Sequence, residues 1–493
     1  SLEKERARDK ISLWIFMQQV AQTHPARQGL RLERRIFMEY AVLLYVIIVI
    51  ALGILGYRKN ADVSELNIGQ GNISWISTSF SVAATWIWAP ALFVASQRAY
   101  IDGILGLFWF FVPNILCLIF FAFLAEKSRK YGTVETISGL MEKLYNSKRV
   151  FWAYNTELAI LAICSTAVQL LAGGIALSYI TGYPFLTITI LLALVALTYS
   201  LMGGIRASIS TDVVQMILMI VAVVVALIYL LPVNDIAFNG IKNRSMNFIS
   251  MDNINIFFAY GLTTTIGLLS GPIGDQTFWQ RAFAVNPRNI RKMFIASAFI
   301  FGVIPLGMGI IGGMATSGGF VAKDTSIVGL EFIIAKTSIV IQILFVLCIV
   351  SGLSSTIDSN LCAISSLVTN MHKKLHAVFW GRVSMCLLTI LGIAIANIPG
   401  ISIFYLFLFY GVLRSTVAIP TALTMIKGPV FSESGIFYGI VSALCIGIPI
   451  YLIGALLNIS FMTISGTILA VLLPLAFMRK VGANAKLSGQ KVR

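Results

Sequence analysis

Apolar stretches of about 20 residues recur along almost the whole chain, from Tyr40 to Met478. A helix needs about this length to cross the hydrocarbon core of a bilayer. Only 11% of the 493 residues are charged, whereas about a quarter are charged in a soluble domain. Such a chain cannot coat a globule in water. We therefore expect an all-α polytopic protein, integral to the plasma membrane (the inner membrane of a bacterium), with no soluble catalytic domain.

The pattern predicts about thirteen membrane spans between a basic N-terminal segment, residues 1–38, and a tail, residues 479–493. The Lys and Arg residues fall on alternate connections, as the positive-inside rule requires. Six connections and the tail then lie in the cytoplasm, and the first span starts outside. The predicted spans are residues 39–57, 73–97, 103–125, 151–178, 184–202, 212–232, 255–274, 294–316, 338–369, 378–398, 403–425, 436–456 and 459–478.

The net charge of +16 is spread over short loops and forms no basic face, so we expect membrane lipid and no nucleic acid as a partner. Residues 1–38 do not fit the topology, because eight basic residues against four acidic ones should keep this segment inside. Its apolar stretch, Ile11–Val20, is too short to span and is expected to lie along the interface or to act as a linker. One explanation is a larger parent protein with an exported N-terminal domain.

Helix breakers stand beside hydroxyl side chains inside three predicted spans. Unpaired carbonyls are tolerated in a bilayer only where they face protein or an ion. Spans two and seven each start a group of five helices, and such paired breaks are typical of an inverted-repeat transporter with a site at the midplane. Packed helix interfaces are the simpler explanation for any single place. The three places are Ala83–Pro90, Gly267–Pro272 and Ser351–Ser359, the last in a stretch long enough to tilt or to kink near Gly352.

Five short motifs occur in an order and spacing that is specific when they are taken together. They are Ala83–Ala84–Thr85 followed by Ala99–Tyr100 and Gly103; Tyr199–Ser200–Leu201–Met202–Gly203–Gly204; Thr211–Asp212–Val213–Val214–Gln215; Asp275–Gln276 with Gln280–Arg281; and Ser354–Ser355–Thr356 with Asp358–Ser359. With these motifs the chain resembles the sodium:solute symporter family, which includes bacterial proline, sialic acid and sugar transporters and the sodium/glucose cotransporters.

The resemblance implies a transporter domain over residues 39–478 with a leucine-transporter-like core. Its five-plus-five inverted repeat would cover about residues 73–232 and 255–425. It also implies a sodium-coupled secondary symporter that imports a small polar organic solute by alternating access.

Sodium ion is the implied cofactor, and a hard cation prefers oxygen ligands. Carried over position by position, the family's shared sodium site falls on the carbonyls of Ala83, Trp86 and Gly352 and on the hydroxyls of Ser355 and Thr356. A second sodium of some members maps to Asp212, Ser355, Asp358 and Ser359. Asp358 departs from the neutral hydroxyl of some relatives, which leaves open a second sodium, a proton or a structural carboxylate.

The solute-binding candidates are Thr85, Trp88, Gln169, Ser270 and Arg414. A charge in the middle of a span costs ~2.5–3.5 kcal/mol on insertion scales. Arg414 therefore needs an anion, either Asp358 or another acid of the protein, or a carboxylate of the solute. Gln169 and Glu157 could line the cavity or bond to neighbouring helices.

The nature of the solute stays open. Trp86 and Trp88, with Asp275–Gln276 and Trp279–Gln280, resemble the urea-type branch of the family, whereas Arg414 favours an acid. Among other functions, an intramembrane enzyme lacks its motifs, since HExxH is absent and Pro272 takes the first glycine position of GxGD. The main alternative is a transporter-like sensor or receptor domain without net transport.

Overall fold

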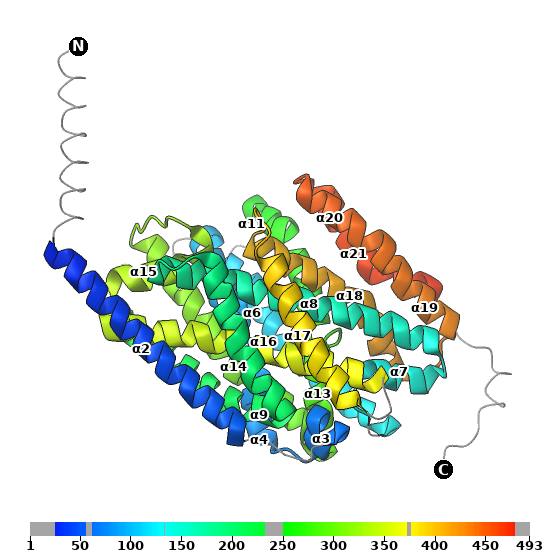
Figure 1. The fold of residues 1–493 in the computed structure, drawn as a ribbon. Coiled ribbons are helices and arrows are strands. Elements are labelled where there is room, and N and C mark those ends of the chain that lie inside the picture. Colours follow the sequence, from blue (N-terminus) through cyan, green and yellow to red (C-terminus); the bar gives the residue numbers. More distant parts are fainter. Residues whose placement is uncertain (1–24, 56–61, 133, 232–249, 372–375, 479–493) are drawn as a thin grey trace.

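The computed structural model describes residues 25–55, 62–132, 134–231, 250–371 and 376–478. Within these ranges the chain is a bundle of helices without a strand, which confirms the predicted all-α class (Figure 1). The apolar stretch Ile11–Val20 and the tail 479–493 lie outside the described residues.

The helices follow one another with short connections. They are α2 (Pro25–Leu55), α3 (Val63–Ile68), α4 (Trp75–Trp86), α5 (Ala89–Leu92), α6 (Val94–Ser128), α7 (Ile137–Tyr145), α8 (Lys148–Thr181), α9 (Phe185–Leu230), α11 (Met251–Ile256), α12 (Leu262–Ser270), α13 (Gln276–Ala284), α14 (Ile290–Ser317), α15 (Val328–Lys336), α16 (Ile339–Met371), α17 (Ala377–Ala396), α18 (Ile403–Lys427), α19 (Glu433–Ser442), α20 (Ile448–Leu456) and α21 (Ser460–Phe477). Single turns of other helix types, η1 to η7, lie between some of them.

Ten helical segments among the described residues are long and apolar enough to cross a membrane. The predicted spans at residues 184–202 and 212–232 form one helix, α9, with a break at Gly204. The predicted spans at 73–97 and 255–274 are each broken into shorter helices. The ten segments therefore do not settle the predicted number of thirteen spans.

Two glycines with positive φ mark the places where α6 and α9 change direction. Gly103 has φ 67° and Gly204 has φ 55°. Residues with a Cβ rarely adopt this conformation, whereas glycine does so at no steric cost. At Gly204 an added Cβ would also lie 2.6 Å from the carbonyl oxygen of Leu66.

Two of the three predicted helix breaks are present. Helix α4 ends at Trp86, and α5 begins at Ala89 with Pro90 in its first turn. Helix α12 ends at Ser270, and α13 begins after its N-cap Asp275. The third prediction is wrong, because α16 runs through Gly352 as one helix. Its hydroxyl groups bond back onto the helix, as when Ser354 donates to the carbonyl of Val350 at 2.7 Å.

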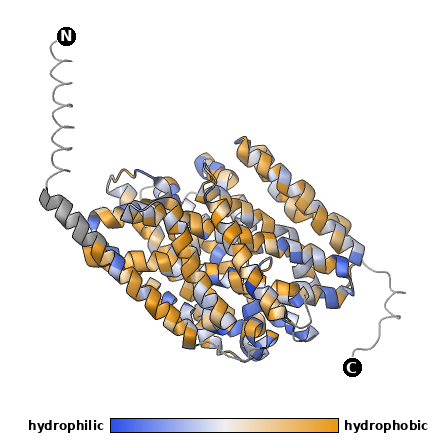
Figure 2. Ribbon diagram, in the orientation of Figure 1, coloured by the Kyte–Doolittle hydropathy of each residue, from blue (hydrophilic) through white to orange (hydrophobic). Residues whose placement is uncertain are grey.

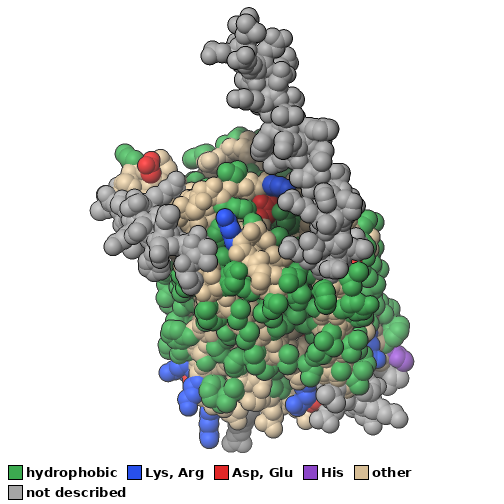
Figure 3. Space-filling model, turned by 90° about the vertical axis from the view of Figure 1, so that its left-hand side faces the viewer, with side chains coloured by type: hydrophobic (Ala, Val, Ile, Leu, Met, Phe, Trp, Pro, Cys, Tyr) green, Lys and Arg blue, Asp and Glu red, His purple; other side chains and the backbone are tan. Residues whose placement is uncertain are grey.

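The bundle has an inner and an outer layer. In the most apolar windows of α8, α16 and α18, 78%, 72% and 72% of the residues are buried, against 22% in those of α2 and α21. The outer helices present hydrophobic faces (Figure 2). A band of hydrophobic side chains surrounds the molecule, and Lys and Arg gather along its lower edge (Figure 3). This end, at which α3, α7 and α13 lie in Figure 1, is the basic end below.

Candidate ion and solute site

The break between α4 and α5 places backbone oxygens against the middle of α16. Thr356 Oγ1 lies 3.2 Å from the carbonyl oxygen of Gly352, 3.3 Å from that of Thr85 and 3.4 Å from that of Ile87. The last carbonyls of a helix have no partner within it, and here they meet a hydroxyl. Such an oxygen-only set suits a hard cation like sodium.

Of the predicted ligands of the first sodium, Gly352 and Thr356 belong to this oxygen cluster. The carbonyl of Ala83 accepts the amide of Ile87 at 3.0 Å, and Trp86 ends α4. Thr85 and Ile87, which were not predicted as ligands, contribute the carbonyls nearest to Thr356. Ser355 is turned toward a different neighbour, since its hydroxyl donates to Oδ1 of Asp212.

The four residues predicted for a second sodium are gathered by short contacts between α9 and α16. Asp212 accepts from Ser355, while Oδ1 of Asp358 accepts from Ser359 at 3.2 Å and from Ser208 at 2.9 Å. The other oxygen of Asp358, Oδ2, is buried and has no hydrogen-bond partner among the described residues.

A guanidinium group already lies within this cluster. Arg281 Nη2 is 3.0 Å from Asp212 Oδ2 and 2.7 Å from Ser359 Oγ, and its Nε donates to Ser81 at 2.8 Å. The sequence interpretation placed Arg281 in a cytoplasmic loop, which is wrong, because the side chain is fully buried in α13. A charge removed from water requires a paired and hydrogen-bonded partner, and Asp212 provides it.

Thr85 was predicted to bind the solute, but its hydroxyl lies 2.9 Å from that of Ser359 and so faces the ion cluster. Gln169 was a second such candidate. Its Oε1 accepts the amide of Ala89 at 2.7 Å, so that it caps the second half of the broken helix. Both side chains support the break in the conformation described.

Arg414 has an internal counter-ion. Its Nη2 lies 2.5 Å from Oδ2 of Asp275, and both side chains are buried. Asp275 also caps α13, because its Oδ1 accepts the amide of Thr277 at 2.9 Å. The sequence left Asp358 or another acid as the partner; Asp358 is wrong, and the other acid is Asp275.

The rest of the Arg414 guanidinium is enclosed by aromatic rings. Its central carbon lies 4.2 Å from the ring centre of Tyr410, 5.2 Å from that of Trp86 and 5.4 Å from that of Trp88. Such cation–π contacts are worth ~2 kcal/mol or more when desolvated. Nε and Nη1 of Arg414 and the indole nitrogens of both tryptophans have no acceptor among the described residues.

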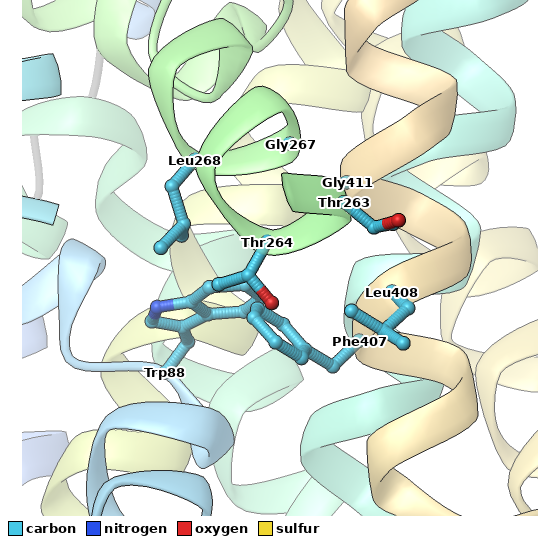
Figure 4. Close-up of a pocket in the computed structure, with 8 residues that line it drawn as sticks. All are labelled: Trp88, Thr263, Thr264, Gly267, Leu268, Phe407, Leu408 and Gly411. Carbon is cyan, nitrogen blue, oxygen red and sulfur yellow. The ribbon is translucent and has the colours of Figure 1, made fainter. Parts of the chain in front are cut away.

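A narrow cleft lies on the other side of Trp88. Trp88 and Phe407 face Thr264 there, below Gly267 of α12 (Figure 4). Its free volume is about 0 Å³, so its walls touch in this conformation. Thr263 and Leu408 also line a wider pocket of about 190 Å³ between α18 and α20, toward the end opposite the basic end (Figure 1).

The two broken helices pack directly on each other at the inner end of this cleft. A Cβ added to Gly271 would lie 2.4 Å from the Trp86 ring, and one on Gly274 would lie 2.5 Å from the carbonyl oxygen of Arg414. Ser270, the remaining solute candidate, ends α12 immediately before Gly271 and is buried. The cleft, the pair Asp275–Arg414 and the ion cluster therefore meet around Trp86.

A helical membrane bundle with paired broken helices at its centre defines a secondary active transporter. The fold is leucine-transporter-like, as the comparison with a solved sodium-coupled sialic acid symporter in an outward-open state shows. The TM-score is 0.66 at 16% identity, and the match covers 90% of this chain and 99% of that one. The model of the sodium:solute symporter family matches residues 67–441, and the chain belongs to this family. The family name specifies sodium, in agreement with the predicted cofactor.

Curated relatives are more distant than the family match alone suggests. The probable urea active transporter 1 of Schizosaccharomyces pombe is 23% identical over 272 residues, which are 50% of this chain and 40% of that protein. The sodium/pantothenate symporter of Haemophilus influenzae is 21% identical over 440 residues, 84% of this chain and 89% of that protein. The chain spans about half the length of the urea transporters that it matches.

Proposed function

We propose that this protein is a sodium-coupled symporter that imports a small polar solute by alternating access, with its basic end in the cytoplasm of the cell and its membrane the plasma membrane. The observation that carries the proposal is the oxygen cluster of Thr356 with the carbonyls of the α4 break, one residue from Trp86. Ion and solute would then act on the same break, and an ion bound there changes the wall of the cleft. A ligand can shift a conformational equilibrium only through such differential contacts.

Uptake into vesicles that contain the purified protein tests the coupling. We expect uptake driven by an inward sodium gradient and none when choline replaces sodium at the same pH. Equal uptake in both buffers would rule out sodium coupling. Counterflow of preloaded solute distinguishes this function from the alternative, a sensor or receptor domain, because only a carrier exchanges solute across the membrane.

For the solute we propose a neutral compound with a carbonyl group, of the urea or amide type. Asp275 neutralises Arg414, so the site needs no further anion. The donors left over, Nε and Nη1 of Arg414 and the indole nitrogens of Trp86 and Trp88, suit a carbonyl oxygen. The relatives named as urea transporters support this class, whereas the pantothenate symporter supports a carboxylate.

A thermal-unfolding screen of the purified protein decides between the two classes. Urea and small amides are compared with pantothenate and other carboxylates, each with sodium and with choline. A ligand at 100 times its Kd stabilises by about 2.7 kcal/mol. Stabilisation by carboxylates alone would overturn the proposed solute and leave the sodium coupling intact.

We infer further that the cluster around Arg281 takes up one more cation. Asp212 and Asp358 carry two negative charges against one positive charge on Arg281, and the cluster is buried. Like charges in a low dielectric repel unless a cation or a proton balances them. Oδ2 of Asp358, without a partner among the described residues, is the atom that would bind the sodium or the proton.

A further inference from the structure

Glu157 of α8 is a fully buried carboxyl group. Neither of its two oxygens has a hydrogen-bond partner among the described residues. Glu331, also buried, differs from it, because its oxygens accept the amides of Lys323 at 2.7 Å and of Asp324 at 3.2 Å. A carboxylate requires such donors when it is removed from water. The environment of Glu331 thus suits an ionised group, and that of Glu157 does not.

The neighbours of Glu157 supply no free positive charge. Tyr154, one turn away on the same helix, bonds to Thr421 of α18 at 2.9 Å, so this face of α8 lies against α18. The ionisable groups that act on Glu157 are Tyr154, Asp275 and Arg414. Since Asp275 and Arg414 neutralise each other, an ionised Glu157 would leave the group of three with a net charge of −1.

We propose that Glu157 is a proton-binding site of the transport cycle, which holds a proton while the cleft is closed and releases it to water when the site opens. The O–H bond breaks, its electron pair stays on the carboxylate, and a water molecule takes the proton. Water that enters hydrates the carboxylate, which lowers the cost of its charge. The proposal rests on the alternating-access cycle proposed above and adds a second linked ion beside the solute site.

The position of Glu157 explains how the proton and the solute would influence each other. The ion pair that bounds the solute cleft is the same pair that neighbours Glu157. A solute that draws Arg414 toward itself weakens the contact with Asp275 and changes the charge that Glu157 experiences. By linkage, a proton on Glu157 must then change the affinity of the solute by the same factor.

Infrared spectroscopy of the full chain in lipid tests the protonation without any solute. At neutral pH we expect a carbonyl band of protonated carboxyl groups that loses the contribution of one group in Glu157→Gln. Glu157→Asp should keep that contribution, and Glu331→Gln, the matched control, should leave the band unchanged. An identical band in wild type and in Glu157→Gln would overturn the proposal, and Glu157→Asp serves if the Gln variant fails to fold.

The link to the cycle is tested by stabilisation with sodium chloride against choline chloride over a range of pH. We expect the sodium concentration for half-maximal stabilisation to depend on pH in wild type and in Glu331→Gln, and to be independent of pH in Glu157→Gln. A parallel pH dependence in wild type and Glu157→Gln would show that the proton is not part of the cycle. If sodium stabilises no variant at any pH, the proposed sodium coupling fails, whereas the infrared result still decides whether Glu157 holds a proton.

Discussion

Arg281 of α13 and Asp212 of α9 form an ion pair of 3.0 Å in which neither side chain is exposed. The pair lies among the residues predicted for a second sodium. Asp275, the N-cap of the same short helix, pairs with Arg414 of α18. Helix α13 therefore connects the ion cluster with the wall of the solute cleft, and a displacement of this helix would disturb both pairs together.

The first prediction concerns the stability that the pair provides. Arg281→Gln should lower the free energy of unfolding by about 3–5 kcal/mol, because it leaves a buried carboxylate without its partner. The double variant Arg281→Gln, Asp212→Asn should recover most of the loss. The measurement is thermal unfolding of the purified variants.

Arg291→Gln is the matched control for this experiment. Arg291 pairs with Glu126 at the surface, where its side chain is 50% exposed. A surface pair contributes about 0–1 kcal/mol. If both single variants unfold alike, the pair Arg281–Asp212 is not the structural centre that its burial indicates.

The second prediction concerns the oxygen cluster of the α4 break. Thr356→Ala should raise the sodium concentration for half-maximal uptake about tenfold or more, since a lost ligand worth about 1.4 kcal/mol corresponds to a factor of ten. The Km for the solute at saturating sodium should change much less. Ser355→Ala should have a similar effect through Asp212, to which Ser355 donates.

Thr416→Ala provides the control for a buried threonine. Its hydroxyl bonds only to the carbonyl of Leu413 in its own helix, among the contacts described. We expect no change in the sodium requirement. An equal rise in Thr416→Ala and Thr356→Ala would show a loss of helix stability rather than of an ion ligand.

Most of the helical framework could be predicted from the sequence, because length, hydropathy and helix breakers are local properties. Pro90 and Pro272 end helices through their own covalent structure, and the breaks before them were predicted correctly. The segment around Gly352 shows the limit of this reasoning. Its many hydroxyls resembled a break, yet Ser354 and Ser359 bond to carbonyls of their own helix, which continues.

The partners of the buried charges could not be predicted. Arg281 stands 69 positions from Asp212, and Arg414 stands 139 positions from Asp275. Nothing local distinguishes Arg281 from the neighbouring surface arginines. Glu157 was noticed as a polar group within a span, but only the packing of α8 shows that both of its oxygens lack donors among the described residues.

The third prediction concerns the extra carboxyl group of the ion cluster. Asp358→Ser should lower the Hill coefficient of sodium-dependent uptake toward one if the balancing cation is sodium. If it is a proton, the variant should instead lose part of the pH dependence of uptake. Both follow from the net charge of −1 that Asp212 and Asp358 leave against Arg281.

Uptake measured over a range of sodium concentrations at several pH values separates these two results. Asp324→Ser is a useful comparison, because this aspartate lies in an exposed turn outside the bundle core, where it accepts the amide of Ser326. An Asp358→Ser variant with unchanged sodium stoichiometry and unchanged pH dependence would mean that the carboxyl group is structural.

The fourth prediction distinguishes an internal from an external anion for Arg414. Its contact with Asp275 is made through one nitrogen, and a lysine ammonium can also form a contact of this kind. Arg414→Lys should therefore remain folded and bind a neutral solute within a few-fold of wild type. Arg414→Ala leaves Asp275 buried and unpaired, which should cost about 3–5 kcal/mol. Arg414→Ala combined with Asp275→Asn should restore stability but not uptake. A carboxylate solute held by two parallel bonds would give the opposite pattern, because lysine cannot replace the planar fork of arginine. Solute affinity and the unfolding midpoint of all three variants, measured side by side, decide the question; a strong loss of affinity in Arg414→Lys at unchanged stability would show that the solute supplies the anion.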